Sequence, residues 1–259
     1  APYGVRIIEA PILKMQDFDY SGVDVVLLES PSNPGLDLCD IAVISAKVHA
    51  AGGLVMVDNT TMTPLLQRPL DLGADVVLAS DTKAPAGHSD VLFGHVASRN
   101  AAFMARVLDW RRLSGAVPGA FEAWLLHRGL ETLELRLARM CASAEVIATR
   151  LLDSGLVQNL RYPGLKSDAS YPLACKQMQG FGFIMGFDLP SADVAEAFLT
   201  NCPFIAQATS FGSTHSSGER RARWGDQVSP GFIRLSIGCE PVEPLWDAIF
   251  QALRQASAM

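Results

Sequence analysis

Short apolar runs alternate with a helical pattern over the first hundred residues of the chain. Four of these runs have the length and apolar character of buried strands: Val23–Glu29, Leu54–Val57, Asp75–Ala79 and Val91–Ser98. Ile41–Ala51 has helical spacing and ends at Gly52-Gly53, which suits a helix C-terminus. Leu65–Gly73 is a short connection with helical character. The pattern predicts a βαβ unit with parallel strands and a right-handed crossover, and therefore an α/β fold.

The second half of the chain follows a different pattern. Two helices are predicted, Ala101–Leu113 and Phe121–Leu152, and the second is expected to break at Gly129. A smaller α+β unit follows, with strands at Val157–Tyr162, Phe183–Asp188, Ile205–Thr209 and Phe232–Ile237. Its predicted helices are Leu173–Gln179, Ala192–Leu199 and Glu243–Gln255. We therefore expect a large domain over residues 1–128 and a C-terminal α+β domain over 129–259 that includes the connecting helix.

Polar clusters follow three of the predicted strands at the point where each strand ends. These clusters are Glu29–Pro34, Asp58–Thr60 and Ser80–Lys83. In open parallel sheets, ligands bind beyond the carboxyl ends of the strands. The sequence therefore predicts one site at this edge of the sheet.

The chemistry of this edge is that of a pyridoxal phosphate (PLP) site. Lys83 could carry the cofactor aldehyde as a Schiff base, and the hydroxyls beside it could hold a phosphate. Asp58 could keep the pyridine nitrogen protonated, because a buried carboxylate needs such a partner. Each residue also has an ordinary interpretation: Lys83 as a solvated lysine after a strand, and Asp58 as a turn or helix-capping residue.

Arg234 lies in the middle of a predicted apolar strand, where an unmatched charge is costly. A guanidinium binds a carboxylate through two parallel hydrogen bonds, so an amino-acid substrate is one natural partner. An internal salt bridge is the alternative.

Composition excludes several other classes of function. The formal net charge is −6, with 49% hydrophobic and 19% charged residues, which fits a well-packed globular protein without a nucleic-acid or membrane partner. Arg220–Arg223 is the one basic cluster, and we expect it to be a solvated loop. Five scattered cysteines without a CxxC pair indicate reduced thiols in a cytoplasmic protein. The five histidines lack metal-ligand spacing, so no metal site is expected.

The chain resembles the PLP-dependent enzymes of cysteine and methionine metabolism, the cystathionine γ-synthase/γ-lyase family. The matching stretches occur in family order: Glu29–Pro34, Val57–Thr60, Gln67–Asp75, Ser80–Lys83, Gly87–Asp90, Tyr162–Leu165 and Arg234–Gly238. Each stretch is weak alone, but together they are specific and cover nearly all of the chain. The resemblance implies the fold-type I aminotransferase architecture, and usually a homotetramer.

The resemblance also implies a role for each candidate residue. Lys83 would carry the cofactor and later move protons, while Asp58 would pair with the pyridine nitrogen. The phosphate would be held by Ser80 and Thr82. The substrate α-carboxylate would be bound by Asn33, Ser210 and Arg234, with Asn33 also near the ring oxygen.

The sequence departs from the family pattern in two places. Family members are longer at the N-terminus, and the strand-like Val5–Ile8 follows a start without methionine, so we expect the beginning of the protein to be missing. The missing part normally supplies a ring-stacking tyrosine and further phosphate ligands. In Ser210–His215, the histidine replaces a family glutamate that is often linked to substrate discrimination.

The expected function is PLP-dependent α,γ-elimination of cystathionine, a small sulfur-containing amino acid, to cysteine, 2-oxobutanoate and ammonia. Cystathionine γ-lyase is preferred because Thr209–Gly212 and Glu219–Gly225 resemble the actinobacterial-type members. One alternative is cystathionine γ-synthase or a related replacement on an activated homoserine ester. The other is a truncated, non-catalytic scaffold with an empty cofactor site.

Overall fold

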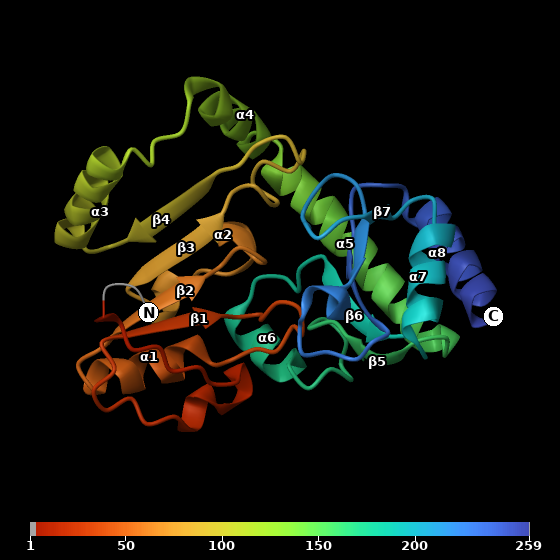
Figure 1. The fold of residues 1–259 in the computed structure, drawn as a ribbon, viewed down its shortest axis with the longest axis horizontal. Helices are drawn as coiled ribbons and strands as arrows, with labels where there is room; N and C mark the ends of the chain where they lie inside the picture. The colour runs from red at the N-terminus through yellow and green to blue at the C-terminus, as the bar shows by residue number, and fades with distance from the viewer. Residues whose placement is uncertain (1–3, 259) are drawn as a thin grey trace.

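The computed structural model describes residues 4–258 and contains two β-sheets (Figure 1). The first sheet has the order β1-β2-β3-β4, with β1 (Val25–Glu29), β2 (Leu54–Asp58), β3 (Val76–Ser80) and β4 (Gly94–Ser98). The first three strands are parallel and β4 is antiparallel to β3. The expected parallel arrangement of the first three strands is therefore confirmed.

Successive side chains of the parallel strands point to opposite faces of the first sheet, and α1 covers only one of these faces. Val55 and Val57 on β2 are fully buried against α1 (Ile41–Ala50). Side chains of the opposite face include Leu27 and Leu54, and both are exposed. Helix α1 begins at Asp40, whose carboxylate accepts a hydrogen bond from the Val43 amide at 3.0 Å. Two short elements follow β2, α2 (Thr63–Leu66) and the 3-10 turn η3 (Pro69–Leu72), where a helical connection is predicted.

The second sheet has the order β5-β6-β9-β8-β7. Its strands are β5 (Gln158–Arg161), β6 (Ile184–Asp188), β7 (Ala206–Gln207), β8 (Ser217–Arg220) and β9 (Phe232–Ser236), antiparallel except for the β7–β8 pair. Its helices are α5 (Leu133–Ser154), α6 (Tyr171–Gln177), α7 (Ala192–Asn201) and α8 (Val242–Ser257). The largest apolar core of the described residues lies here, where α5, α7 and α8 pack with this sheet.

Two helices connect the sheets, α3 (Ala101–Ser114) and α4 (Ala120–Leu130) (Figure 1). Helix α3 buries none of its residues. The chain from α4 then enters α5, which extends from the first sheet toward the second (Figure 1). No helix of residues 4–258 combines the length and apolar character that a membrane crossing requires.

Three local predictions are wrong. Val5–Ile8 is exposed and forms no strand. The helical run from Phe121 breaks after Leu130, not at Gly129. Strand β8 is missing from the predicted strands, because its sequence, Ser-Gly-Glu-Arg, has no apolar alternation.

The basic cluster Arg220–Arg223 is also not a solvated loop. Arg220 lies on β8 and pairs with Glu196 at 2.5 Å, and Arg223 pairs with the same carboxylate. Arg221 pairs with Asp226 at 2.6 Å. Neighbouring carboxylates therefore neutralise the cluster.

Candidate active site

The three predicted polar clusters meet at the carboxyl ends of β1, β2 and β3. Glu29 and Asp58 are register partners at the ends of β1 and β2, and Asp58 is the register partner of Leu78 on β3. Because side chains alternate along strands, Asp58 and Ser80 project from the same face of the sheet. This face lies opposite the one that α1 covers.

Asp58 is held by the turn that follows it. Its Oδ1 atom accepts a hydrogen bond from the Thr60 amide at 2.9 Å. The Thr60 hydroxyl in turn accepts one from the Ser80 amide at 2.8 Å, which ties the ends of β2 and β3 together. Within residues 4–258, the second carboxylate oxygen of Asp58 and the Ser80 hydroxyl form no hydrogen bond.

Lys83 extends from the end of β3 in the first sheet to the loop between β7 and β8 of the second sheet. Its Nζ atom donates a hydrogen bond to the Ser210 hydroxyl at 2.8 Å and lies 5.1 Å from the centroid of the Phe211 ring. Burial lowers the pKa of the Lys83 ammonium, and the nearby positive charge of Arg234 lowers it further. Both effects favour the neutral amine that covalent bonding to an aldehyde requires.

Arg234 lies on β9 and is only 3% exposed. Its guanidinium donates to the Asn33 side-chain oxygen at 2.6 Å and to the Thr209 carbonyl. Burial lowers its pKa to about 10, so it still carries a positive charge at neutral pH. Asn33 and Arg234, 201 positions apart in sequence, are therefore in direct contact.

Glu29 adds a second carboxylate beside this cluster. Its Oε2 atom accepts a hydrogen bond from the Asn33 amide at 3.1 Å. Burial raises the pKa of Glu29, and the neighbouring negative charge of Asp58 raises it as well. The predicted site did not assign a role to this residue.

Thr82 and His215 differ from the other candidates. The Thr82 hydroxyl accepts a hydrogen bond from the Phe93 amide at 3.0 Å and donates to the Phe93 carbonyl at 3.3 Å, so it fastens the lysine-bearing turn. His215 is exposed, and its Nδ1 atom lies near the hydroxyls of Ser213 and Thr214. None of its hydrogen bonds within residues 4–258 joins it to Lys83 or Arg234.

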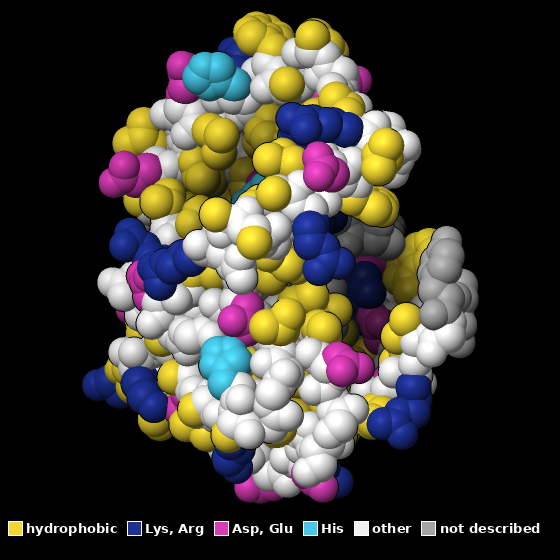
Figure 2. Space-filling model, turned by 90° about the vertical axis from the view of Figure 1, so that its left-hand side faces the viewer, with side chains coloured by type: hydrophobic (Ala, Val, Ile, Leu, Met, Phe, Trp, Pro, Cys, Tyr) yellow, Lys and Arg dark blue, Asp and Glu magenta, His cyan; other side chains and the backbone are white. Residues whose placement is uncertain are grey.

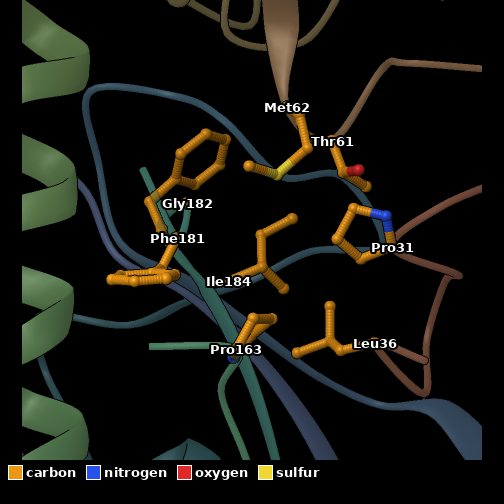
Figure 3. A pocket seen from close by; sticks show the side chains of 9 residues that line it. Pro31, Leu36, Thr61, Met62, Pro163, Phe181, Gly182 and Ile184 are labelled. Carbon is orange, nitrogen blue, oxygen red and sulfur yellow. The ribbon is translucent and has the colours of Figure 1, made fainter. Parts of the chain in front are cut away.

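Two cavities lie near this region, and neither is lined by Lys83, Asp58 or Arg234. The first, of about 10 Å³, lies between Pro31, Met62 and Ile184 (Figure 3). It has room for no more than about one water molecule, so it is not a substrate site. The second, of about 200 Å³, is lined by Val77 and His95 on the face of the sheet opposite Asp58.

The residues at the strand ends fit pyridoxal phosphate. A partly desolvated lysine, a carboxylate with one uncommitted oxygen and a serine hydroxyl without a partner in residues 4–258 are the donor set that this cofactor needs. Arg234 and Asn33 beside them suit a carboxylate. The fold and the site therefore define the class of PLP-dependent enzymes.

Comparison with known proteins gives the family. Residues 14–254 match the family model described as Cys/Met metabolism PLP-dependent enzyme. The chain belongs to this family and has the fold-type I architecture of its members, as the resemblance predicted.

Individual relatives carry different activity names. A Streptomyces coelicolor protein provisionally named cystathionine gamma-lyase is 46% identical over 98% of this chain and 66% of its own. The crystal structure of apo CalE6, a methionine gamma lyase from Micromonospora echinospora, is 40% identical with a TM-score of 0.85, over 89% of this chain and 63% of its own. Cystathionine gamma synthase from Xanthomonas oryzae pv. oryzae, in complex with cystathionine, is 36% identical with a TM-score of 0.87, over 91% and 64%. The chain thus spans slightly less than two thirds of these relatives.

Proposed function

We propose that this chain, in its complete protein, is a PLP-dependent carbon–sulfur lyase that eliminates cysteine from cystathionine and yields 2-oxobutanoate and ammonia. The observation that carries the proposal is the arrangement of Lys83, hydrogen-bonded to Ser210, and Arg234 against the same Phe211 ring, which places a partly desolvated amine near a buried cation. Membership of the Cys/Met metabolism family supports it. The division into domains 1–128 and 129–259, a homotetramer and a cytoplasmic location are parts of the same proposal.

In this mechanism each residue has a defined task. When bound, pyridoxal phosphate supplies an electron sink for the bonds at the substrate α-carbon. Asp58 would hold the proton on the pyridine nitrogen, while Ser80 and Thr82 would hold the phosphate. Asn33 would contact both the ring oxygen and the substrate.

The substrate would be oriented by its α-carboxylate. Arg234 would bind that carboxylate together with Asn33 and Ser210, which places the α-proton beside the Lys83 amine. The amine would then take this proton as a general base, because its lowered pKa keeps part of it neutral. Ser210 accepts a hydrogen bond from this amine and would fix its direction.

The cofactor and its lysine can be tested by mass spectrometry. The complete protein is incubated with pyridoxal phosphate, reduced with borohydride and digested, and we expect a phosphopyridoxyl adduct on the Lys83 peptide. The Lys83→Ala variant should lose the adduct and all turnover while keeping its fold. An unmodified Lys83 in the complete protein would contradict the proposal and leave the non-catalytic scaffold as the better account.

The substrate needs a separate assay. We expect 2-oxobutanoate from cystathionine, measured with purified complete protein. A γ-synthase is the second candidate, supported by the likeness to the Xanthomonas enzyme. Formation of cystathionine from an activated homoserine ester and cysteine, with no 2-oxobutanoate from cystathionine, would favour that candidate.

A further inference from the structure

A buried aspartate paired with a partly exposed histidine lies at the lysine-bearing turn. Asp81, 4% exposed, follows Ser80 and precedes Thr82. Its Oδ1 atom lies 2.8 Å from Nδ1 of His95 on β4. The proposed function uses neither residue.

The pair extends the connection between β3 and β4 beyond the end of their ladder. The last register partners are Ala79 with His95 and Ser80 with Gly94. Beyond Ser80, the turn is attached to β4 and the residue before it through Asp81 with His95 and through Thr82 with Phe93. His95 therefore holds the turn that carries both proposed phosphate ligands.

The position of Asp81 creates an electrostatic problem for a phosphate. A buried carboxylate between Ser80 and Thr82 repels an anion bound by their hydroxyls. A protonated His95 would cancel this charge. The Asp81 hydrogen bond raises the pKa of His95 above its ordinary value, so the cation persists to higher pH than in an unpaired histidine.

The other charged groups that line the cavity beside His95 do not neutralise the Asp81 carboxylate. The cavity that His95 lines also contains Arg68, Asp71 and Arg99. Arg99 pairs with Asp71, and Arg68 donates to the Pro64 carbonyl. His95 is the cation of this group that contacts Asp81.

We propose that His95 is a positioning residue which neutralises Asp81 beside the phosphate-binding turn and makes retention of the cofactor depend on pH. This inference rests on the proposed function. Below the pKa of His95 the pair has no net charge and the phosphate is tolerated. As the pH rises through that pKa, the pair becomes negative and cofactor affinity falls.

The test is a titration of the cofactor-free complete protein with pyridoxal phosphate, followed by absorbance between pH 6 and pH 9. His95→Gln keeps a hydrogen-bond donor but removes the charge. At pH 6 we expect its dissociation constant to be about tenfold above that of the wild type, the effect of one nearby unit charge. The ratio of the two dissociation constants should fall as the pH rises toward 9, because wild-type His95 then loses its proton and its charge.

A double variant separates charge from shape. Asp81→Asn combined with His95→Gln should recover wild-type affinity at pH 6, because neither side chain then carries a charge. His49→Gln is the matched control, since His49 forms a similar 2.8 Å pair with Asp75 away from the turn. It should leave the affinity unchanged at every pH.

Three results would overturn the proposal. A His95→Gln ratio that is the same at pH 6 and pH 9 would indicate a purely structural role. Failure of the double variant to recover would show that charge is not the cause. Failure of the wild-type protein to bind the cofactor at any pH would instead overturn the proposed function, and this inference with it.

Discussion

Phe211 supports two cations with one aromatic ring. The Nζ atom of Lys83 and the guanidinium carbon of Arg234 each lie 5.1 Å from its centroid. The ring is 6% exposed, so both contacts are largely shielded from water. A cation over an aromatic face contributes about 0.5–2 kcal/mol, depending on desolvation. The ring therefore holds the proposed proton carrier and the proposed carboxylate ligand at a fixed spacing.

Replacing this ring by an aliphatic side chain tests its contribution. We expect Phe211→Leu to retain the fold, because Leu remains apolar and fills most of the space, and to raise KM about two- to fivefold through loss of the cation–π contacts. Steady-state kinetics on the complete protein would measure this change. Phe204→Leu, at an exposed position after α7, is the matched control, and equal kinetics for both variants would contradict the role of Phe211.

Arg234 gives a stronger prediction at the same scale. A lysine can keep the charge but cannot hold Asn33, Thr209 and a substrate carboxylate with one planar group. We expect Arg234→Lys to raise KM by about tenfold or more while the cofactor stays bound. The measurement is kinetics together with cofactor absorbance, and an unchanged KM would count against carboxylate binding by Arg234.

Sequence reasoning reached Lys83, Asp58 and Arg234 because each carries its own signal: a polar cluster at a strand end, or a charge within an apolar strand. The contact of Arg234 with Asn33 required the resemblance, since no local pattern links residues that far apart. Glu29 falls within the predicted polar cluster Glu29–Pro34, but the sequence indicated no role of its own for it. Phe211 lies within Ser210–His215, but a single phenylalanine in that stretch indicates no role until the two cations beside it are located.

At the scale of elements, Arg136 joins the lysine-bearing turn to the helices behind it. Its buried guanidinium donates to the carbonyls of Ala84 at 2.7 Å, Pro85 at 3.1 Å and Gly129 at 2.7 Å. The first two carbonyls directly follow Lys83, and the third lies at the end of α4. One side chain on α5 thus satisfies carbonyls of two separate segments.

Within residues 4–258, removing this side chain leaves the carbonyls of Ala84 and Pro85 without a partner, whereas the Gly129 carbonyl keeps its hydrogen bonds from Thr132. We expect Arg136→Ala to lower the free energy of unfolding by about 3 kcal/mol, since each unsatisfied group costs about 1–3 kcal/mol and relaxation recovers part of the loss. Chemical denaturation would measure this. Arg106→Ala, on the exposed surface of α3, should change stability by less than about 0.5 kcal/mol. Equal effects for the two variants would refute the structural role of Arg136.

The packing of Gly129 against the lysine-bearing turn explains why the predicted helix break was misplaced. A glycine within a helical pattern predicted a break, but Gly129 instead lets helix α4 approach the backbone of Ala86 closely. A β-carbon at position 129 would lie 2.6 Å from the Ala86 carbonyl oxygen. Helix α4 continues through it to Leu130. Strand β8 was missed for a related reason, since its place beside β9 comes from tertiary pairing and not from its own polar sequence.

At the scale of the whole molecule, one side carries a broad apolar surface. Helices α3 and α4 and the segment between them expose Trp110, Leu113, Phe121 and Trp124, with Leu113 89% exposed. Figure 2, which views this side, shows hydrophobic side chains grouped over its upper part. Exposed apolar surfaces of this kind mark interaction sites in proteins. A homotetramer, as the family resemblance implies, would give this surface a partner.

We therefore expect the complete protein to have the mass of four chains by light scattering. Replacing Leu113 and Trp124 together by glutamate places charges on the apolar surface, and burying them on assembly would be costly. The double variant should shift toward smaller species at micromolar concentration, because most of its core lies elsewhere and stays intact. Leu152→Glu, on the C-terminal half of α5, is the control and should keep the wild-type mass. A monomeric wild-type protein would contradict the tetramer, whereas a double variant that still forms four chains would assign the assembly to another surface.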